Sequence, residues 1–375
     1  MKKVLFSLSM LLASGASFAQ IADGYYRLKS ATTERYAVVM DNRGSVDVAA
    51  TSVDLGAIHS FKDYEGNVVS NPGSIIYAKS GGDGYDLQSQ AASTYSMVGY
   101  YIQIRESRNT EGAYWAYGSK SGQTIYIADS NTSGEEGILV DNGGRHDWYI
   151  LPVETEGDNY FGVRPSVEVG GKYYQPFYAA FPFTFHSNGM KAYYVSKFGG
   201  DMAVIKEYTG GELPKSMPMI IECGAAEPTD NRLNLLASSS AAAASDNILS
   251  GTYFNNSWPS NHRNRVTNDP ATIRMLGVTS TGELGMVAKP DVDYVPANTA
   301  YLVVPEGTPS ELRLVDEDEF EATVGITEVE TETKTEAMGG VYTLAGVKVA
   351  EGTTLPSNLP SGVYIVGGKK VVVKN

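Results

Sequence analysis

Tyr25-Tyr26-Arg27-Leu28-Lys29-Ser30, the stretch YYRLKS at residues 25–30, returns twice in altered form: as IIYAKS at residues 75–80 and as YWAYGS at residues 114–119. A second short alternating run follows each serine. These second runs begin at Tyr36, Tyr85 and Thr124. Aromatic and β-branched residues in short alternating runs favour β-strands. Units repeating every ~40 to 50 residues indicate four short strands each, closing around a pseudo-threefold axis.

An aromatic residue closes each unit. The three residues are Phe61, Tyr100 and Trp148. We expect their rings to fill the interior of one closed barrel. The pattern resembles the ricin-B-like β-trefoil, whose repeats end in Gln-x-Trp, although His59, Val98 and His146 stand where the glutamines would be. The resemblance implies a β-trefoil domain over residues 20–153.

The same resemblance implies a sugar-binding site. In that family an aspartate near the start of a repeat holds the sugar, beside an aromatic ring on which the sugar stacks. Asp41 and Asp129, after the second strand of units one and three, are the nearest matches. Trp115 and Tyr117 are the candidate platform, because a flat ring can stack on the apolar face of a sugar. The sequence leaves open that these rings are core packing instead.

Residues 155–320 are predicted to form a β-sandwich. FYAAFPFTF at 177–185 and further runs up to 300–304 are expected strands. The segments 213–220 and 295–302 mirror one another, each with a proline that begins a turn before an apolar strand, as repeated corners would require. This region resembles β-sandwich modules of secreted Bacteroidota proteins.

Beyond the sandwich, the sequence predicts an acidic linker at residues 321–338, because like charges repel and apolar residues are scarce there. Residues 339–375 then alternate as short strands, with Gly367-Gly368 suited to a two-residue hairpin turn. This module resembles C-terminal sorting domains of the type IX secretion system, which implies the secretion machinery as a partner. A short β module that merely caps the fold is the open alternative.

The N-terminus has the layout of a secretory signal peptide over residues 1–19. Lys2 and Lys3 precede an apolar stretch, and Ser17 and Ala19 flank a cleavage site. No later segment has the length of a transmembrane span. We therefore expect an exported protein, secreted or on the outer-membrane surface. The formal charge of −14 disfavours nucleic acid as a partner.

Catalytic and metal-binding motifs are missing from the sequence. The four histidines show no helical i, i+4 pair, and the single cysteine, Cys223, is expected to be a buried hydrophobe. Residues 129–134 match half of a calcium loop, but Val140 stands where a glutamate ligand belongs. We expect no cofactor, no metal and no enzyme activity. The predicted function is a non-catalytic, carbohydrate-binding surface protein, and the alternatives are a structural or adhesive protein with protein partners and a hydrolase with an unrecognised site.

Overall fold

The structure is a computed structural model. It describes residues 21–40, 58–81, 84–88, 103–120, 122–130, 133–254, 265–328, 340–343, 348–352, 355–356, 359–366 and 369–373. The chain divides into two compact units, Met1–Phe320 and Glu321–Asn375. Strands account for 49% of the structure and helices for 6%, so the predicted all-β class is confirmed. No helix among the described residues is long and apolar enough to cross a membrane.

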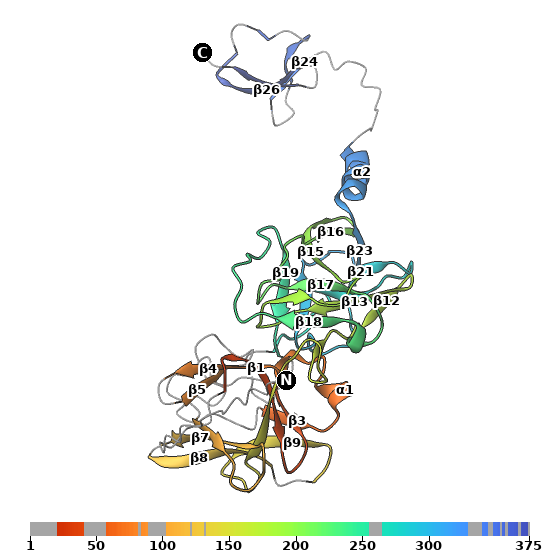
Figure 1. Ribbon diagram of the computed structural model, residues 1–375. Helices are drawn as coiled ribbons and strands as arrows, with labels where there is room; N and C mark the ends of the chain where they lie inside the picture. The colour runs from red at the N-terminus through yellow and green to blue at the C-terminus, as the bar shows by residue number, and fades with distance from the viewer. Residues whose placement is uncertain are drawn as a thin grey trace, which may run out of the picture. The chain divides into compact units, whose positions relative to one another are not determined.

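The first unit begins with a closed β-barrel, coloured red to yellow in Figure 1. Its strands are β1 (Gly24–Ser30), β2 (Tyr36–Val39), β3 (Ile58–Phe61), β4 (Ile76–Gly81), β5 (Gly84–Gln88), β6 (Gln103–Glu106), β7 (Tyr114–Lys120), β8 (Gln123–Asp129), β9 (Glu136–Asp141) and β10 (Asp147–Pro152). The pairings run β10-β7-β8-β9-β3-β2-β1 and close through β1 with β10. Strands β4 and β5 continue from β1, and β6 pairs with β7. A short helix, α1 (Tyr64–Asn67), follows β3.

Trp148 is the largest side chain in the barrel core and has no exposed surface. Aliphatic side chains such as Leu28, Ile76 and Ile104 surround it. The expectation that Phe61 shares this core is wrong, because Phe61 packs in a separate small cluster with Val38 and Val68. Tyr100 lies outside the described residues. The barrel core therefore has one described ring from the predicted set, and it packs with aliphatic side chains and with the rings of Tyr85 and Phe254.

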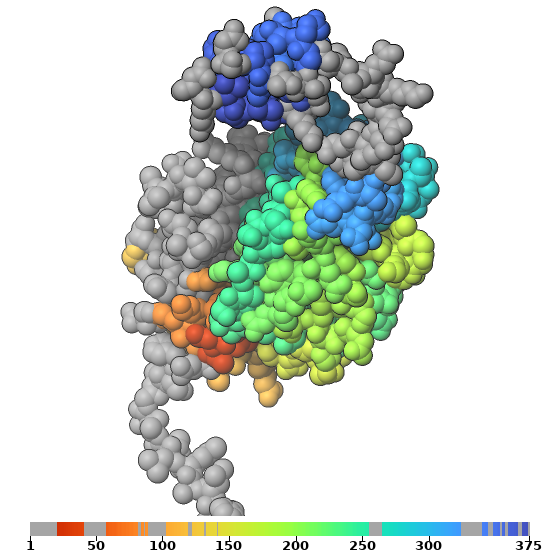
Figure 2. Space-filling model, turned by 90° about the horizontal axis from the view of Figure 1, so that it is seen from above, coloured from red at the N-terminus to blue at the C-terminus, as the bar shows by residue number. Residues whose placement is uncertain are grey.

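The second part of the first unit is a sandwich-like arrangement of two sheets. Its strands are β11 (Phe161–Gly162), β12 (Val167–Val169), β13 (Lys172–Phe177), β14 (Phe183–Phe185), β15 (Lys191–Gly199), β16 (Met202–Glu207), β17 (Met219–Cys223), β18 (Arg232–Leu235), β19 (Leu249–Thr252), β20 (Ile273–Val278), β21 (Leu284–Val287), β22 (Thr299–Val303) and β23 (Glu311–Val315). Strands β11, β18 and β14 form one sheet, and the others pair in the order β12-β13-β17-β15-β16-β23-β21-β20-β22-β19. In space-filling view, the green and cyan segments form one continuous body (Figure 2).

The two mirrored proline segments form equivalent corners, as predicted. Ser216 and Asn298 stand at matching positions and adopt left-handed backbone conformations, with φ of 59° and 54°. Both corners bind the same stretch of backbone: Ser216 N donates to Ala179 O at 2.8 Å, and Tyr178 N donates to Asn298 O at 2.9 Å. Residues 177–185 are therefore not one strand, because the backbone at Tyr178 and Ala179 pairs with corners instead of a neighbouring strand.

A buried arginine ties the barrel to the chain that enters the sandwich. The acceptors of Arg27, all neutral, are Ser74 Oγ, Tyr64 Oη, Asn159 Oδ1, Tyr160 O and Val69 O, at 2.7 to 3.2 Å. Burial lowers the pKa of Arg27 to about 10. A guanidinium offers five N–H donors, so one side chain can satisfy this whole set. Arg27 therefore joins strand β1 of the barrel to the residues that precede β11.

The predicted acidic linker begins as a helix, which corrects the expectation for residues 321–328. Helix α2 spans Glu317–Glu328. Asp316 Oδ1 accepts a hydrogen bond from Glu319 N at 2.8 Å, and acidic residues fill the first turn. Carboxylates near a helix N-terminus are stabilising because they offset the partial positive charge of the free N–H groups. The cluster of acidic residues at this position therefore favours the start of a helix.

The second unit contains a four-stranded antiparallel sheet in the order β25-β24-β26-β27. The strands are β24 (Gly340–Thr343), β25 (Lys348–Glu351), β26 (Gly362–Val366) and β27 (Lys369–Val373). Val366 pairs with Lys369, so β26 and β27 are joined by two residues, as the hairpin prediction requires. Val341, Leu359 and Tyr364 form its small core.

Candidate functional site

Three neighbouring barrel strands present an arginine and three aromatic side chains on one face. Arg105 of β6 pairs with Trp115 of β7, and Tyr117 of β7 pairs with Tyr126 of β8. These four side chains are partly exposed, while Ala116 between the two β7 rings is buried in the barrel core. Side chains alternate between the two faces of a strand, so residues 105, 115, 117 and 126 share the outer face. We call Arg105, Trp115, Tyr117, Tyr126 and His146 the aromatic cluster.

A guanidinium lies at the centre of the aromatic cluster. The Cζ atom of Arg105 is 4.5 Å from the ring centroid of Trp115 and 4.9 Å from that of Tyr117. Its Nη2 donates to Tyr126 Oη at 3.1 Å. Cations within about 6 Å of an aromatic ring are attracted to its face. Arg105 therefore fixes the three rings relative to one another.

Two further groups from the β9–β10 connection and β10 hold the cluster in place. Trp115 Nε1 donates to Asp147 Oδ1 at 2.6 Å, and Asp147 also accepts from Ser107 Oγ. The ring of His146 lies 4.9 Å from that of Tyr126 and 5.5 Å from that of Trp115. Aromatic side chains held this way lose little conformational freedom on binding a ligand. The cluster is a pre-arranged surface.

The positive charge of Arg105 has no ion-pair partner among the described residues, and its buried Nε has no hydrogen-bond acceptor there. The carboxylate of Asp147 is engaged by Trp115 and Ser107. The aromatic cluster thus combines apolar ring surface with hydrogen-bonding groups and one cation. Surfaces of this composition can bind ligands that have both apolar faces and polar edges.

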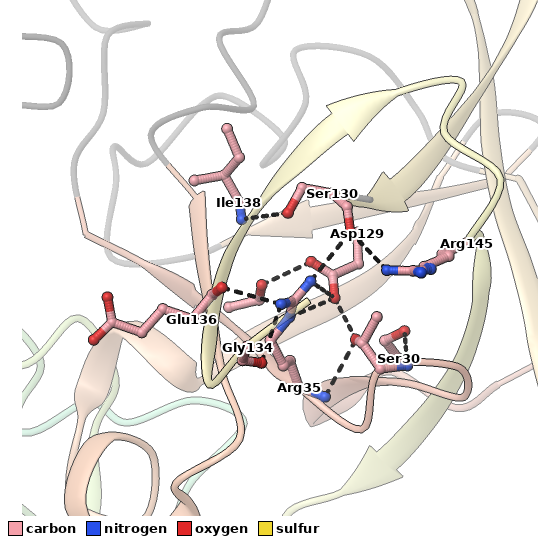
Figure 3. A network of polar contacts seen from close by, with 10 residues as sticks. Ser30, Arg35, Asp129, Ser130, Gly134, Glu136, Ile138 and Arg145 are labelled. Atoms are coloured by element: carbon pink, nitrogen blue, oxygen red, sulfur yellow. Dashed lines mark hydrogen bonds and ion pairs between the residues drawn. The ribbon is translucent and has the colours of Figure 1, made fainter. Parts of the chain in front are cut away.

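Asp129 does not belong to this surface. Its carboxylate is buried at the end of β8 and forms an ion pair with Arg35, 2.8 Å from Nη2 and 2.8 Å from Nε. Ser60 Oγ donates to Oδ1 at 2.7 Å, and Thr33 Oγ1 also donates to Oδ2. Figure 3 shows this network, which ties β3 and β8 to Arg35, the residue directly before β2. The prediction that Asp129 contacts a ligand is corrected, because the carboxylate has no exposed surface and its lone pairs are used internally.

The structure therefore brings together two of the four predicted site residues, Trp115 and Tyr117. Asp41 lies outside the described residues. Sequence reasoning missed Arg105, Tyr126 and His146, which complete the cluster. The strand register was the missing signal: the pairing of β6 with β7 and of β7 with β8 places Arg105 and Tyr126 beside the two predicted rings, and the pairing of β10 with β7 brings His146 there.

Cys223 is a poor candidate for nucleophilic chemistry. The thiol is buried in the sandwich core, and burial raises its pKa to about 12. Thiolates, not thiols, are the nucleophilic form of cysteine. The side chain therefore packs as a small hydrophobe, as the sequence predicts.

No protein-family model and no curated protein matches the chain.

Proposed function

We propose that this chain is a non-catalytic carbohydrate-binding protein of the cell surface or the secreted fraction, and that the aromatic cluster is its binding surface. The observation that carries the proposal is the set of three partly exposed rings, Trp115, Tyr117 and Tyr126, fixed around Arg105 on one barrel face. Ring faces can stack on the C–H faces of a sugar while the guanidinium and the phenol hydroxyls hydrogen-bond its edges.

Strand pairing supports the β-trefoil assignment that underlies this proposal. A trefoil of the expected kind requires a barrel of six strands and hairpins that cap it. The observed pairings of β1 with β4 and β10, of β4 with β5, and of β7 with β6 and β10 fit those barrel strands. The pairs β2–β3 and β8–β9 fit two caps. The trefoil assignment itself stays a proposal.

A glycan array probed with the full chain tests the function. The matched variants are Tyr126→Ala, which removes a ring of the cluster, and Tyr149→Ala, which removes a partly exposed tyrosine of β10 that lies outside it. We expect wild type and Tyr149→Ala to bind the same glycans and Tyr126→Ala to lose about tenfold or more in affinity. Equal binding by both variants would contradict the assignment of the site, and an empty array with wild type would contradict the function.

A protein partner is the second candidate occupant of the same surface. Trp, Tyr and Arg are the residue types enriched among the strongest contributors to protein–protein affinity, and the cluster contains all three. Under this alternative the chain is a structural or adhesive component. Binding of a folded, non-glycosylated protein partner that Tyr126→Ala abolishes, without binding to any glycan, would favour it.

Export and sorting form a separate part of the proposal. The N-terminal signal layout and the four-stranded C-terminal unit support secretion by a type IX system, in which the second unit is recognised by the machinery. Deletion of residues 339–375 in a bacterium that has this system is expected to retain the protein inside the cell. Secretion of the deleted chain at the wild-type level would contradict the sorting role.

A further inference from the structure

A cavity of about 470 Å³ lies within the first unit, between the barrel and the sandwich. Tyr25 of β1 and Tyr77 of β4 line it from the barrel, and Phe181 and Pro214 line it from the sandwich. Small-molecule sites are clefts of about 300 to 1,000 Å³ and occur preferentially where domains meet. The cavity is separate from the aromatic cluster, since no residue of that cluster lines it.

One wall of the cavity is aromatic. The ring centroids of Tyr25 and Tyr77 are 4.9 Å apart, and the rings of Tyr25 and Phe181 form a T-shaped pair with centroids 6.0 Å apart. Burial raises the pKa of Tyr25, so its phenol stays neutral in the cavity. Phe181 is buried and belongs to the sandwich core. The ring surface of this wall suits a flat apolar body.

Among the described residues that line the cavity, Lys215 is the one that is charged. It follows Pro214 in the first of the two mirrored corners, and the left-handed Ser216 fixes that corner by donating to Ala179 O. No ion pair of Lys215 occurs in the described part of the chain. Lys215 therefore places one positive charge at the wall of the cavity, on a chain whose formal charge is −14. A ligand with one anionic group is favoured there by charge.

The serine- and alanine-rich segment at residues 237–243 lines one side of the cavity as a loop. Tyr208 Oη donates to Ala242 O at 2.9 Å, and Ser239 Oγ donates to Glu212 Oε2 at 2.6 Å, which hold the loop to the sandwich. Ala241 lines the cavity, whereas its exposed neighbour Ala242 does not. Side chains as small as these leave space for a ligand in the cavity. This is the physical role of the segment, which forms no helix.

We propose that this cavity is a second binding site, for a small organic anion with a flat apolar body. The aromatic wall stacks on the body, Lys215 pairs with the anionic group, and the small residues of the loop leave room for both.

Anilinonaphthalene sulfonate is a suitable probe because it combines flat rings with one sulfonate. Its fluorescence is titrated with the full chain and with Ala241→Phe, which fills the cavity, against Ala242→Phe, which adds the same ring to the same loop outside it. Wild type and Ala242→Phe are expected to bind the dye equally, and Ala241→Phe to lose about tenfold or more in affinity. Near-ultraviolet circular dichroism verifies that each variant is folded.

Charge recognition is tested with Lys215→Gln and two dyes. The variant is expected to bind the sulfonate about fivefold or more weakly while its affinity for the neutral dye Nile red is unchanged. Trp115→Ala is expected to leave dye binding intact, which separates this site from the carbohydrate proposal. No saturable dye binding by wild type, or equal binding by Ala241→Phe and Ala242→Phe, would overturn the inference.

Discussion

Arg35 and Asp129 form a fully enclosed ion pair, 2.8 Å from Nη2 to Oδ2, with 1% and 0% of their side-chain surface exposed. The pair joins the start of the second barrel strand to the end of the eighth (Figure 3). Removal of one partner from a buried pair leaves an uncompensated charge in a poorly solvated place. Asp129 is therefore a structural residue of the barrel.

Asp129→Asn is expected to lower the free energy of unfolding by about 3 to 5 kcal/mol, because Arg35 keeps its charge without a carboxylate. The exposed pair Lys191–Glu207 supplies the control: Glu207→Gln is expected to cost less than about 1 kcal/mol. Urea denaturation of both variants measures the difference. Equal stability of the two variants would show that the buried pair is not a structural element.

Arg27→Met is expected to lower the free energy of unfolding by about 3 kcal/mol or more, because several buried acceptors lose their donor together. Arg164 provides the control, since it donates to Glu65 O at 2.8 Å from an exposed position. Arg164→Met is expected to cost less than about 1 kcal/mol. If urea denaturation gave the same small loss for both, Arg27 would not be a tie between the barrel and the sandwich.

His59 gives the first unit a defined pH dependence. Burial lowers its pKa below the ordinary value of 6.5, against the opposite effect of Glu136. As pH falls below 6.5, the unfolded chain binds a proton before the folded chain does, so stability present above that value is lost on acidification.

The measurement is urea unfolding at about pH 7.5 and about pH 5.5. From the higher to the lower pH, wild type is expected to lose more stability than the His59→Gln variant. His186→Gln, which removes an exposed ring, is the control and should lose as much as wild type. A loss in His59→Gln that matches wild type would assign the pH dependence to other groups.

Local patterns in the sequence predict much of this fold. Short alternating runs give the strands, the Gly367-Gly368 pair gives the closing hairpin, and the mirrored prolines give two corners with matching left-handed residues. These features depend on residues that lie close together in the sequence. A single sequence is therefore enough to predict them.

Apart from the helix at residues 321–328, where a local cap starts α2, the errors concern long-range packing. Phe61 is the last residue of β3, and Trp148 lies at the start of β10. The two side chains pack in different clusters. Asp129 has the spacing of a ligand residue, yet its partner Arg35 stands far away in sequence. Only the strand register determines which residues meet, and for the same reason Trp115 and Tyr117 could be named while Arg105, Tyr126 and His146 could not.

The most direct test of the carbohydrate surface is the indole N–H signal of each tryptophan in a ¹⁵N spectrum. The chain has three tryptophans, and Trp→Phe variants assign their signals. Trp115 donates to Asp147 within the aromatic cluster, while Trp148 donates to Ile127 O at 2.8 Å in the closed core. Titration with a glycan selected on the array is expected to shift the Trp115 signal and to leave the Trp148 signal in place. Saturable glycan binding with an unmoved Trp115 signal would contradict the account.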